Sequence, residues 1–179
     1  MQNYVIEARS FRIGFASHNF WVLADADSGS TIGELHGLAT SRVTGQTVPI
    51  GTSAEHCLRA YAFAHEPGYA ERLAAPLKFT RMFSRSHSHA AYHGPDGLAR
   101  WCAAVAAIPR LNELDLDYPP YGFNVFRPTV NSNSAYRTFG EIMAVPIHTF
   151  AGVLSPGIAN RMLALEQLAL LRFQVSVTA

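Results

Sequence analysis

Two short segments, far apart in the chain, contain side chains whose types suit acyl-transfer chemistry. His18 opens an apolar run near the N-terminus, and Asn131-Ser132-Asn133-Ser134 precedes a predicted helix. An imidazole at the rim of a rigid sheet is well placed to act as a general base. A hydroxyl at a helix N-terminus is a candidate nucleophile, because free backbone N–H groups and the helix dipole stabilise negative charge there. His18 equally fits a strand-capping histidine bonded to a loop carbonyl.

The downstream motif has two interpretations. Asn and Ser are favoured N-cap residues, so a helix cap accounts for one of its four polar residues. In the other interpretation Ser132 or Ser134 attacks with His18 as base, and backbone N–H groups near Asn133 and Ser134 form an oxyanion hole. The expected substrate-binding residues are then Asn131, Asn133, Ser134 and Arg127.

Arg127 and Arg137 flank the motif. Guanidinium groups there could hold a substrate carboxylate or phosphate. The alternative is an ion pair with Glu141 or with an aspartate.

A β-hairpin is the second feature that bears on His18. Residues 19–24 and 31–38 read as strands around the turn-forming stretch 25–30. If the turn is centred near residues 27 and 28, Glu34 or His36 shares a face with His18 and could orient its ring. A register slip of one residue would separate these groups, and Glu34 would then face solvent.

The remaining pattern predicts one α+β domain over residues 1–179, with a small antiparallel sheet packed against helices. Leu98, Trp101, Cys102 and Val105 should form a buried stripe on one helix, and Tyr136, Phe139, Ile142 and Met143 on another. Strands are expected at 11–15 and 76–83, helices at 53–61, 96–108, 135–144 and 158–171, loops at 40–51, 84–94 and 115–122, and an edge strand at 173–177.

Composition narrows the function classes. The chain has 179 residues, of which 49% are hydrophobic and 15% charged, as in a globular domain. A net charge of +1 without a basic run argues against nucleic-acid binding. The N-terminus predicts no secretory signal and no stretch predicts a transmembrane segment, so we expect a cytoplasmic protein, with signal-peptide-independent export left open. Cys57 and Cys102 are expected to be buried on helices rather than bridged.

The eight histidines include a cluster at Ser86-His87-Ser88-His89, with His93 beyond it. Alternating histidines can bind Zn²⁺ or Cu²⁺. Only Asp96 is near enough in sequence to complete a ligand set, so a solvated loop is the favoured interpretation. No metal site and no cofactor are predicted, because no phosphate-binding Gly loop, paired-Cys motif or zinc-protease motif is present.

The order of the candidate groups resembles the circularly permuted papain-like enzymes, which include NlpC-type peptidases and lecithin:retinol acyltransferase-like proteins. Their permuted members have a His first and a Cys nucleophile later, often within Asn-Cys-Asn-Thr or Asn-Cys-Glu-His. By position Ser132 resembles that cysteine, His18 the base, and His36 or Glu34 the third polar group. The resemblance covers residues 18–36 and 131–139.

The resemblance implies a permuted papain-like hydrolase or acyltransferase that acts on an amide or ester bond of a peptide, lipid or small-molecule substrate. By analogy such a protein would suit a bacterial effector or cell-wall enzyme. Serine at the motif leaves three readings open: a natural serine nucleophile, a domain that has lost activity, or a replaced cysteine.

Two other functions stay open beside this one. The first is a non-catalytic peptide- or acyl-binding domain on the same scaffold, in which Ser132 merely caps a helix. The second is a metal-dependent enzyme that uses His87, His89 and His93. The oligomeric state is not predicted.

Overall fold

Five antiparallel strands form one sheet in the order β4-β3-β2-β1-β5. The computed structural model describes residues 2–13, 16–64, 68–75 and 87–174. The strands are β1 (Tyr4–Ile13), β2 (Ala16–Asp25), β3 (Thr31–Ser41), β4 (His56–Ala64) and β5 (His87–Gly94). With several helices packed on this sheet, the predicted α+β class is confirmed.

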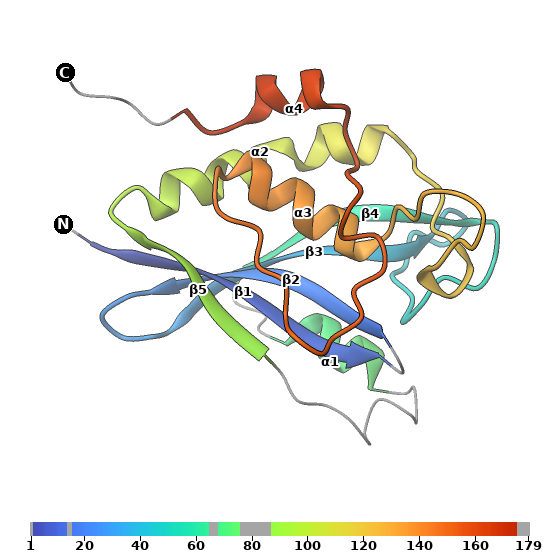
Figure 1. Ribbon diagram of the computed structural model, residues 1–179, viewed down its shortest axis with the longest axis horizontal. Helices are drawn as coiled ribbons and strands as arrows, with labels where there is room; N and C mark the ends of the chain where they lie inside the picture. The colour runs from blue at the N-terminus through green and yellow to red at the C-terminus, as the bar shows by residue number, and fades with distance from the viewer. Residues whose placement is uncertain (1, 14–15, 65–67, 76–86, 175–179) are drawn as a thin grey trace.

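Helices lie on both faces of the sheet (Figure 1). They are α1 (Tyr69–Ala74), α2 (Gly97–Glu113), the short 3₁₀ helix η2 (Pro120–Gly122), α3 (Ser132–Ile142) and α4 (Leu165–Leu171). On one face α2 and α3 cover the main core, and on the other α1 packs on a smaller apolar cluster. In the described part of the chain, no helix combines the length and apolar character needed to cross a bilayer.

Helix α3 is held to the sheet by its apolar stripe. Tyr136, Phe139, Ile142 and Met143 are all fully buried, as their spacing predicts. Trp21 of β2 stacks on the Tyr136 ring at 4.5 Å between centroids, and its indole N–H donates to the Tyr136 carbonyl over 2.7 Å. This contact joins α3 to the middle of the sheet, so the start of α3 has a fixed position relative to β2.

The predicted hairpin of β2 and β3 is confirmed. Its residue pairs run from Ala24–Thr31 to Trp21–Leu35. Asp25 closes the turn, because its carboxylate accepts hydrogen bonds from the backbone N–H groups of Asp27 and Ser28.

Two predictions about the outer strands are wrong. Residues 56–64 form β4, not the end of a helix, because backbone pairing with β3 outweighs the helix propensity of this stretch. Residues 87–94 form β5, not a loop, and pair with β1. A Ser- and His-rich edge strand needs no apolar period, and among the described strands β5 pairs on one side only, with β1.

The helix at 96–108 is confirmed as α2, but its buried face differs from the predicted stripe. Leu98, Cys102 and Val105 are exposed, and the buried positions are Gly97, Arg100, Trp101, Ala104, Ala107 and Leu111. Arg100 turns inward because its guanidinium donates to the carbonyls of Met143 and Ala144 and lies over the Tyr92 ring.

The other predicted elements have mixed outcomes. The last helix covers only residues 165–171, and residues 158–164 form turns, bends and irregular backbone instead of helix. Cys57 is buried on β4, Cys102 is exposed on α2, and both thiols are free. The predicted strand at 76–83 and the end of the predicted tail strand lie outside the described residues.

We expect Gly37→Ala to lower the free energy of unfolding by about 1–3 kcal/mol, as over-packed core variants do. A Cβ atom on Gly37 would lie 2.3 Å from the Ala135 Cβ and 3.3 Å from the Ser132 Cα, so α3 would have to move. Denaturant unfolding measures the loss. In an Ala135→Gly background, where the clashing Cβ is gone, the same change should cost less; an equal cost in both backgrounds would contradict this explanation.

Candidate active site

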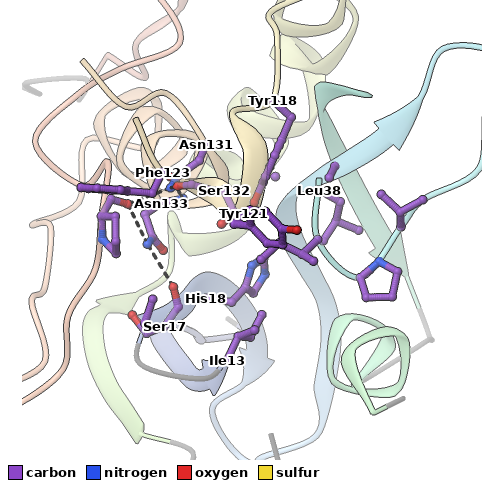
Figure 2. Close-up of a pocket in the computed structure, with 18 residues that line it drawn as sticks. Ile13, Ser17, His18, Leu38, Tyr118, Tyr121, Phe123, Asn131, Ser132 and Asn133 are labelled. Atoms are coloured by element: carbon purple, nitrogen blue, oxygen red, sulfur yellow. Dashed lines mark hydrogen bonds between the residues drawn. The ribbon is translucent and has the colours of Figure 1, made fainter. Parts of the chain in front are cut away.

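A cavity of about 340 Å³ opens where the start of β2, the end of β3 and the N-terminus of α3 meet (Figure 2). His18 and Ser132, the two residues singled out in the sequence, both line it. They come from β2 and α3, which the sequence separates widely. The structure therefore brings the predicted base and the predicted nucleophile to one cavity.

The cavity exists because β2 and β3 stop pairing before either strand ends. The paired residues reach only Trp21 and Leu35, whereas β2 begins at Ala16 and β3 continues to Ser41. The Asn133 side chain occupies the place of a partner strand. Its Oδ1 accepts from the Asn19 N–H over 3.0 Å, and its Nδ2 donates to the Ser17 carbonyl over 3.0 Å.

Three of the four polar side chains in the downstream motif hold the start of α3 in place. Asn131 and Ser134 form a capping box, in which Asn131 Oδ1 accepts from the Asn133 N–H and Ser134 Oγ accepts from the Asn131 N–H. Asn131 also donates to the carbonyls of Gly122 and Pro156. Structural roles therefore account for three of the four polar residues, not for one.

The two backbone N–H groups expected to form an oxyanion hole already have acceptors. The Asn133 N–H donates to the Asn131 side chain, and the Ser134 N–H donates to the Asn131 carbonyl. Neither is free to receive an oxyanion. Ser132 instead lies close enough to the hydroxyl of Tyr118, in the same cavity, for its backbone N–H and side chain to oppose the rise in pKa that burial gives Tyr118.

Tyr118 stays protonated at neutral pH. Burial raises its pKa, and the opposing effect of the Ser132 side chain and backbone does not outweigh burial. Its position is fixed by the neighbouring backbone, because the Tyr118 N–H donates to the His56 carbonyl and residues 116 and 117 run along β4.

His18, His36 and Glu34 form a continuous buried chain of hydrogen bonds. His18 Nε2 lies 2.9 Å from His36 Nδ1, and His36 Nε2 lies 3.0 Å from Glu34 Oε2. The other oxygen of Glu34 accepts from the N–H of Gly68, which caps α1. All three side chains are at most 4% exposed. Thus His36 orients His18 directly, and Glu34 acts through His36.

This chain selects one tautomer for each ring. The Glu34 carboxylate only accepts, so His36 carries its proton on Nε2 and leaves Nδ1 as an acceptor. His18 must then donate from Nε2 to His36. Its Nδ1 is left unprotonated and available as a base.

Burial keeps both histidines neutral. It lowers the pKa of His18 well below 6.5, and the neighbouring His36 lowers it further. Burial also lowers the pKa of His36, although Glu34 opposes the shift. For Glu34, burial raises the pKa, but the hydrogen bonds from His36 and Gly68 outweigh it and the pKa falls. At neutral pH the chain therefore holds one negative charge, at its inner end.

The other candidate residues lie elsewhere. Arg127 is exposed and does not line the cavity. Arg137 forms the alternative ion pair, with Glu141 at 2.8 Å. His87, His89 and His93 lie on β5, and His89 stacks on His148 at 3.8 Å. Among the described residues, no three His, Cys, Asp or Glu side chains are grouped to hold a metal ion.

Tyr118 is not among the residues that the sequence predicts for the site. It belongs to Tyr118-Pro119-Pro120-Tyr121, which predicts a rigid loop. Two prolines beside aromatic residues indicate a fixed aromatic wall, but only the backbone contacts to β4 show that this wall reaches Ser132.

Acidification should destabilise the protein below pH 6.5. The folded state disfavours protonation of His18 and His36, so their contribution to stability is complete above the unfolded pKa of 6.5 and is lost as the pH falls below it. Each histidine adds at most about 1.4 kcal/mol per pH unit to the slope. Urea unfolding from pH 7 to 5 measures it.

The matched variant is His18→Phe, which keeps an aromatic ring beside Phe11 and Phe20. It should reduce the slope, and the exposed His93→Gln controls for the loss of one imidazole. An unchanged slope in His18→Phe would show that His18 does not resist protonation in the fold.

The chain was compared with known protein families, proteins and structures. No protein-family model, no curated protein and no solved structure matches the chain.

Proposed function

We propose that the protein is a hydrolase or acyltransferase that cleaves an amide or ester bond, with Ser132 as nucleophile and His18 as general base. The observation that carries the proposal is the His18–His36–Glu34 chain, which leaves His18 Nδ1 unprotonated, together with the cavity that His18 and Ser132 both line. A serine hydroxyl needs such an oriented base, because its own pKa is far too high for it to ionise alone.

In the proposed step, Ser132 Oγ attacks the carbonyl carbon of the substrate. The new O–C bond forms as the carbonyl π electrons move to oxygen, and the Oγ proton passes to His18 Nδ1. The imidazolium is stabilised through neutral His36 by ionised Glu34, as the third group of a triad does. The electron pair on oxygen then returns to re-form the carbonyl, the bond to the leaving group breaks, and His18 gives its proton to that group. Water or an acceptor alcohol or amine, deprotonated by His18, attacks the acyl-serine, and the bond to Ser132 Oγ breaks as Ser132 takes the proton back.

The oxyanion is assigned to two donors, the backbone N–H of Ser132 and the hydroxyl of Tyr118. Both residues line the same cavity, and Ser132 lies near enough to Tyr118 to affect the pKa of its phenol. The N-terminus of α3 adds a favourable dipole. Because burial keeps Tyr118 protonated, its phenol can donate at neutral pH.

A permuted papain-like architecture is part of the proposal. It is supported by the order of groups along the chain: an imidazole on β2, polar partners on β3, and a hydroxyl at the start of a later helix packed on the same strands. Serine replaces the cysteine of that family, so the chemistry would resemble that of serine hydrolases.

A non-catalytic acyl- or peptide-binding domain is the second candidate. It is favoured because Asn131, Asn133 and Ser134 all make hydrogen bonds that hold the start of α3 in place. Ser132 is then the one residue of the motif without such a structural role. In that case Ser132→Ala would bind ligands as tightly as the native protein, and neither would turn them over.

Fluorophosphonate labelling tests the nucleophile. We expect covalent modification of Ser132, located by peptide mass spectrometry, and no labelling of Ser132→Ala. His18→Phe should slow labelling by about 10³-fold or more, since the base is lost while the ring packing remains. Ser88→Ala, on the exposed edge strand, is the matched control. Modification of a different serine, or equal rates in His18→Phe, would refute the assignment.

Tyr118→Phe tests the oxyanion donor. The variant keeps the ring packed against Gly51 but removes the hydroxyl. On p-nitrophenyl butyrate we expect kcat to fall by about 10²–10³ with KM little changed, as when an oxyanion donor is removed. A kcat equal to that of the native protein would exclude the phenol from the transition state.

A further inference from the structure

We infer that the cavity selects an uncharged, apolar group on its substrate, aliphatic or aromatic, and rejects one that carries a carboxylate or an ammonium. The inference rests on the proposed function for its chemistry, but it concerns what the cavity binds. Its basis is the composition of the walls beside His18 and Ser132.

The walls on the β3 side of His18 are hydrocarbon. Leu38 follows the polar chain on β3, and Figure 2 shows it on the other side of His18 from Ser17 and Asn133. Val48, Pro49 and Ile50, from the loop between β3 and β4, continue the same wall.

Charge is missing from this lining. Among the described residues that form the cavity there is no Lys, Arg, Asp or Glu. His18 is neutral because burial lowers its pKa, and the amide groups of Asn131 and Asn133 are engaged with the backbone. A charged substrate group would lose its hydration here without gaining a partner.

The apolar walls are also held in position. Tyr121 and Phe123, from the loop after α2, line the cavity and remain substantially exposed, at 69% and 48%. The Tyr121 N–H donates to the Gly51 carbonyl over 2.6 Å, which ties this loop to the one that carries Val48 and Ile50. The site is thus preformed, and exposed aromatic rings at its rim suit an apolar ligand.

The binding test uses two amides that differ only at the far end of the chain: octanamide and suberic monoamide, which carries a terminal carboxylate. Titration calorimetry on the native protein at pH 7.5 should show octanamide binding at least about 100-fold more tightly, because the carboxylate would be desolvated without a partner. Equal affinities, or tighter binding of the monoamide, would overturn the inference.

A charge placed on the wall should change this preference. In Val48→Lys an ammonium enters the lining, and we expect the ratio of the two affinities to shift toward the monoamide by at least about tenfold. Val43→Lys adds the same charge to the same loop at a position that is 82% exposed and outside the lining, so it should leave the ratio unchanged. Equal shifts in both variants would point to a surface effect and contradict the assignment of the wall.

Hydrolysis of the matched p-nitrophenyl esters separates the two proposals. Turnover of the octanoate ester but not of its ω-carboxylate supports both. Tight octanamide binding without turnover of either ester keeps the apolar site and refutes the hydrolase. Equal turnover of both esters keeps the hydrolase and refutes the apolar selection.

Discussion

The site depends on one interaction, the insertion of the Asn133 amide between the diverging ends of β2 and β3. Its carbonyl oxygen and its amino group replace a partner strand for Asn19 and Ser17. The start of α3 is thereby joined to β2, so Ser132 takes its position from the sheet and not only from its own helix. Without this bridge the Asn19 N–H and the Ser17 carbonyl of β2 would lose these partners, and proteins rarely tolerate unpaired buried backbone groups.

Burying His18, His36 and Glu34 costs the hydration of three polar side chains, and the hydrogen bonds between them offset this cost. Two imidazoles and a carboxylate lie out of water, and each is satisfied by the next, ending at the Gly68 N–H that caps α1. A fully connected network of this kind fixes one arrangement of protons, whereas the loss of any one member leaves a buried polar atom unpaired. The orientation of the His18 ring is therefore tied to the fold on the α1 face of the sheet.

Local patterns predicted the hairpin and the α3 stripe, because turn chemistry and side-chain periodicity are encoded within short windows. The hairpin also predicted that His36 or Glu34 lies near His18, and His36 does. Local patterns failed for β4 and β5, which form through backbone pairing with distant strands. Arg100 shows the same limit, since its partners are carbonyls that follow α3. Tyr118 and the bridging role of Asn133 required the tertiary structure, as no spacing rule links either residue to Ser132 or to β2.

The segment that carries Tyr118 has a second consequence. Residues 116–118 exchange backbone hydrogen bonds with His56 and Leu58 on β4, the last strand of the sheet. They therefore cover part of an edge that could otherwise recruit strands from other molecules. Movement of this segment to admit a bulky ligand would uncover that edge, so conformational freedom at the cavity and resistance to aggregation oppose each other in this chain.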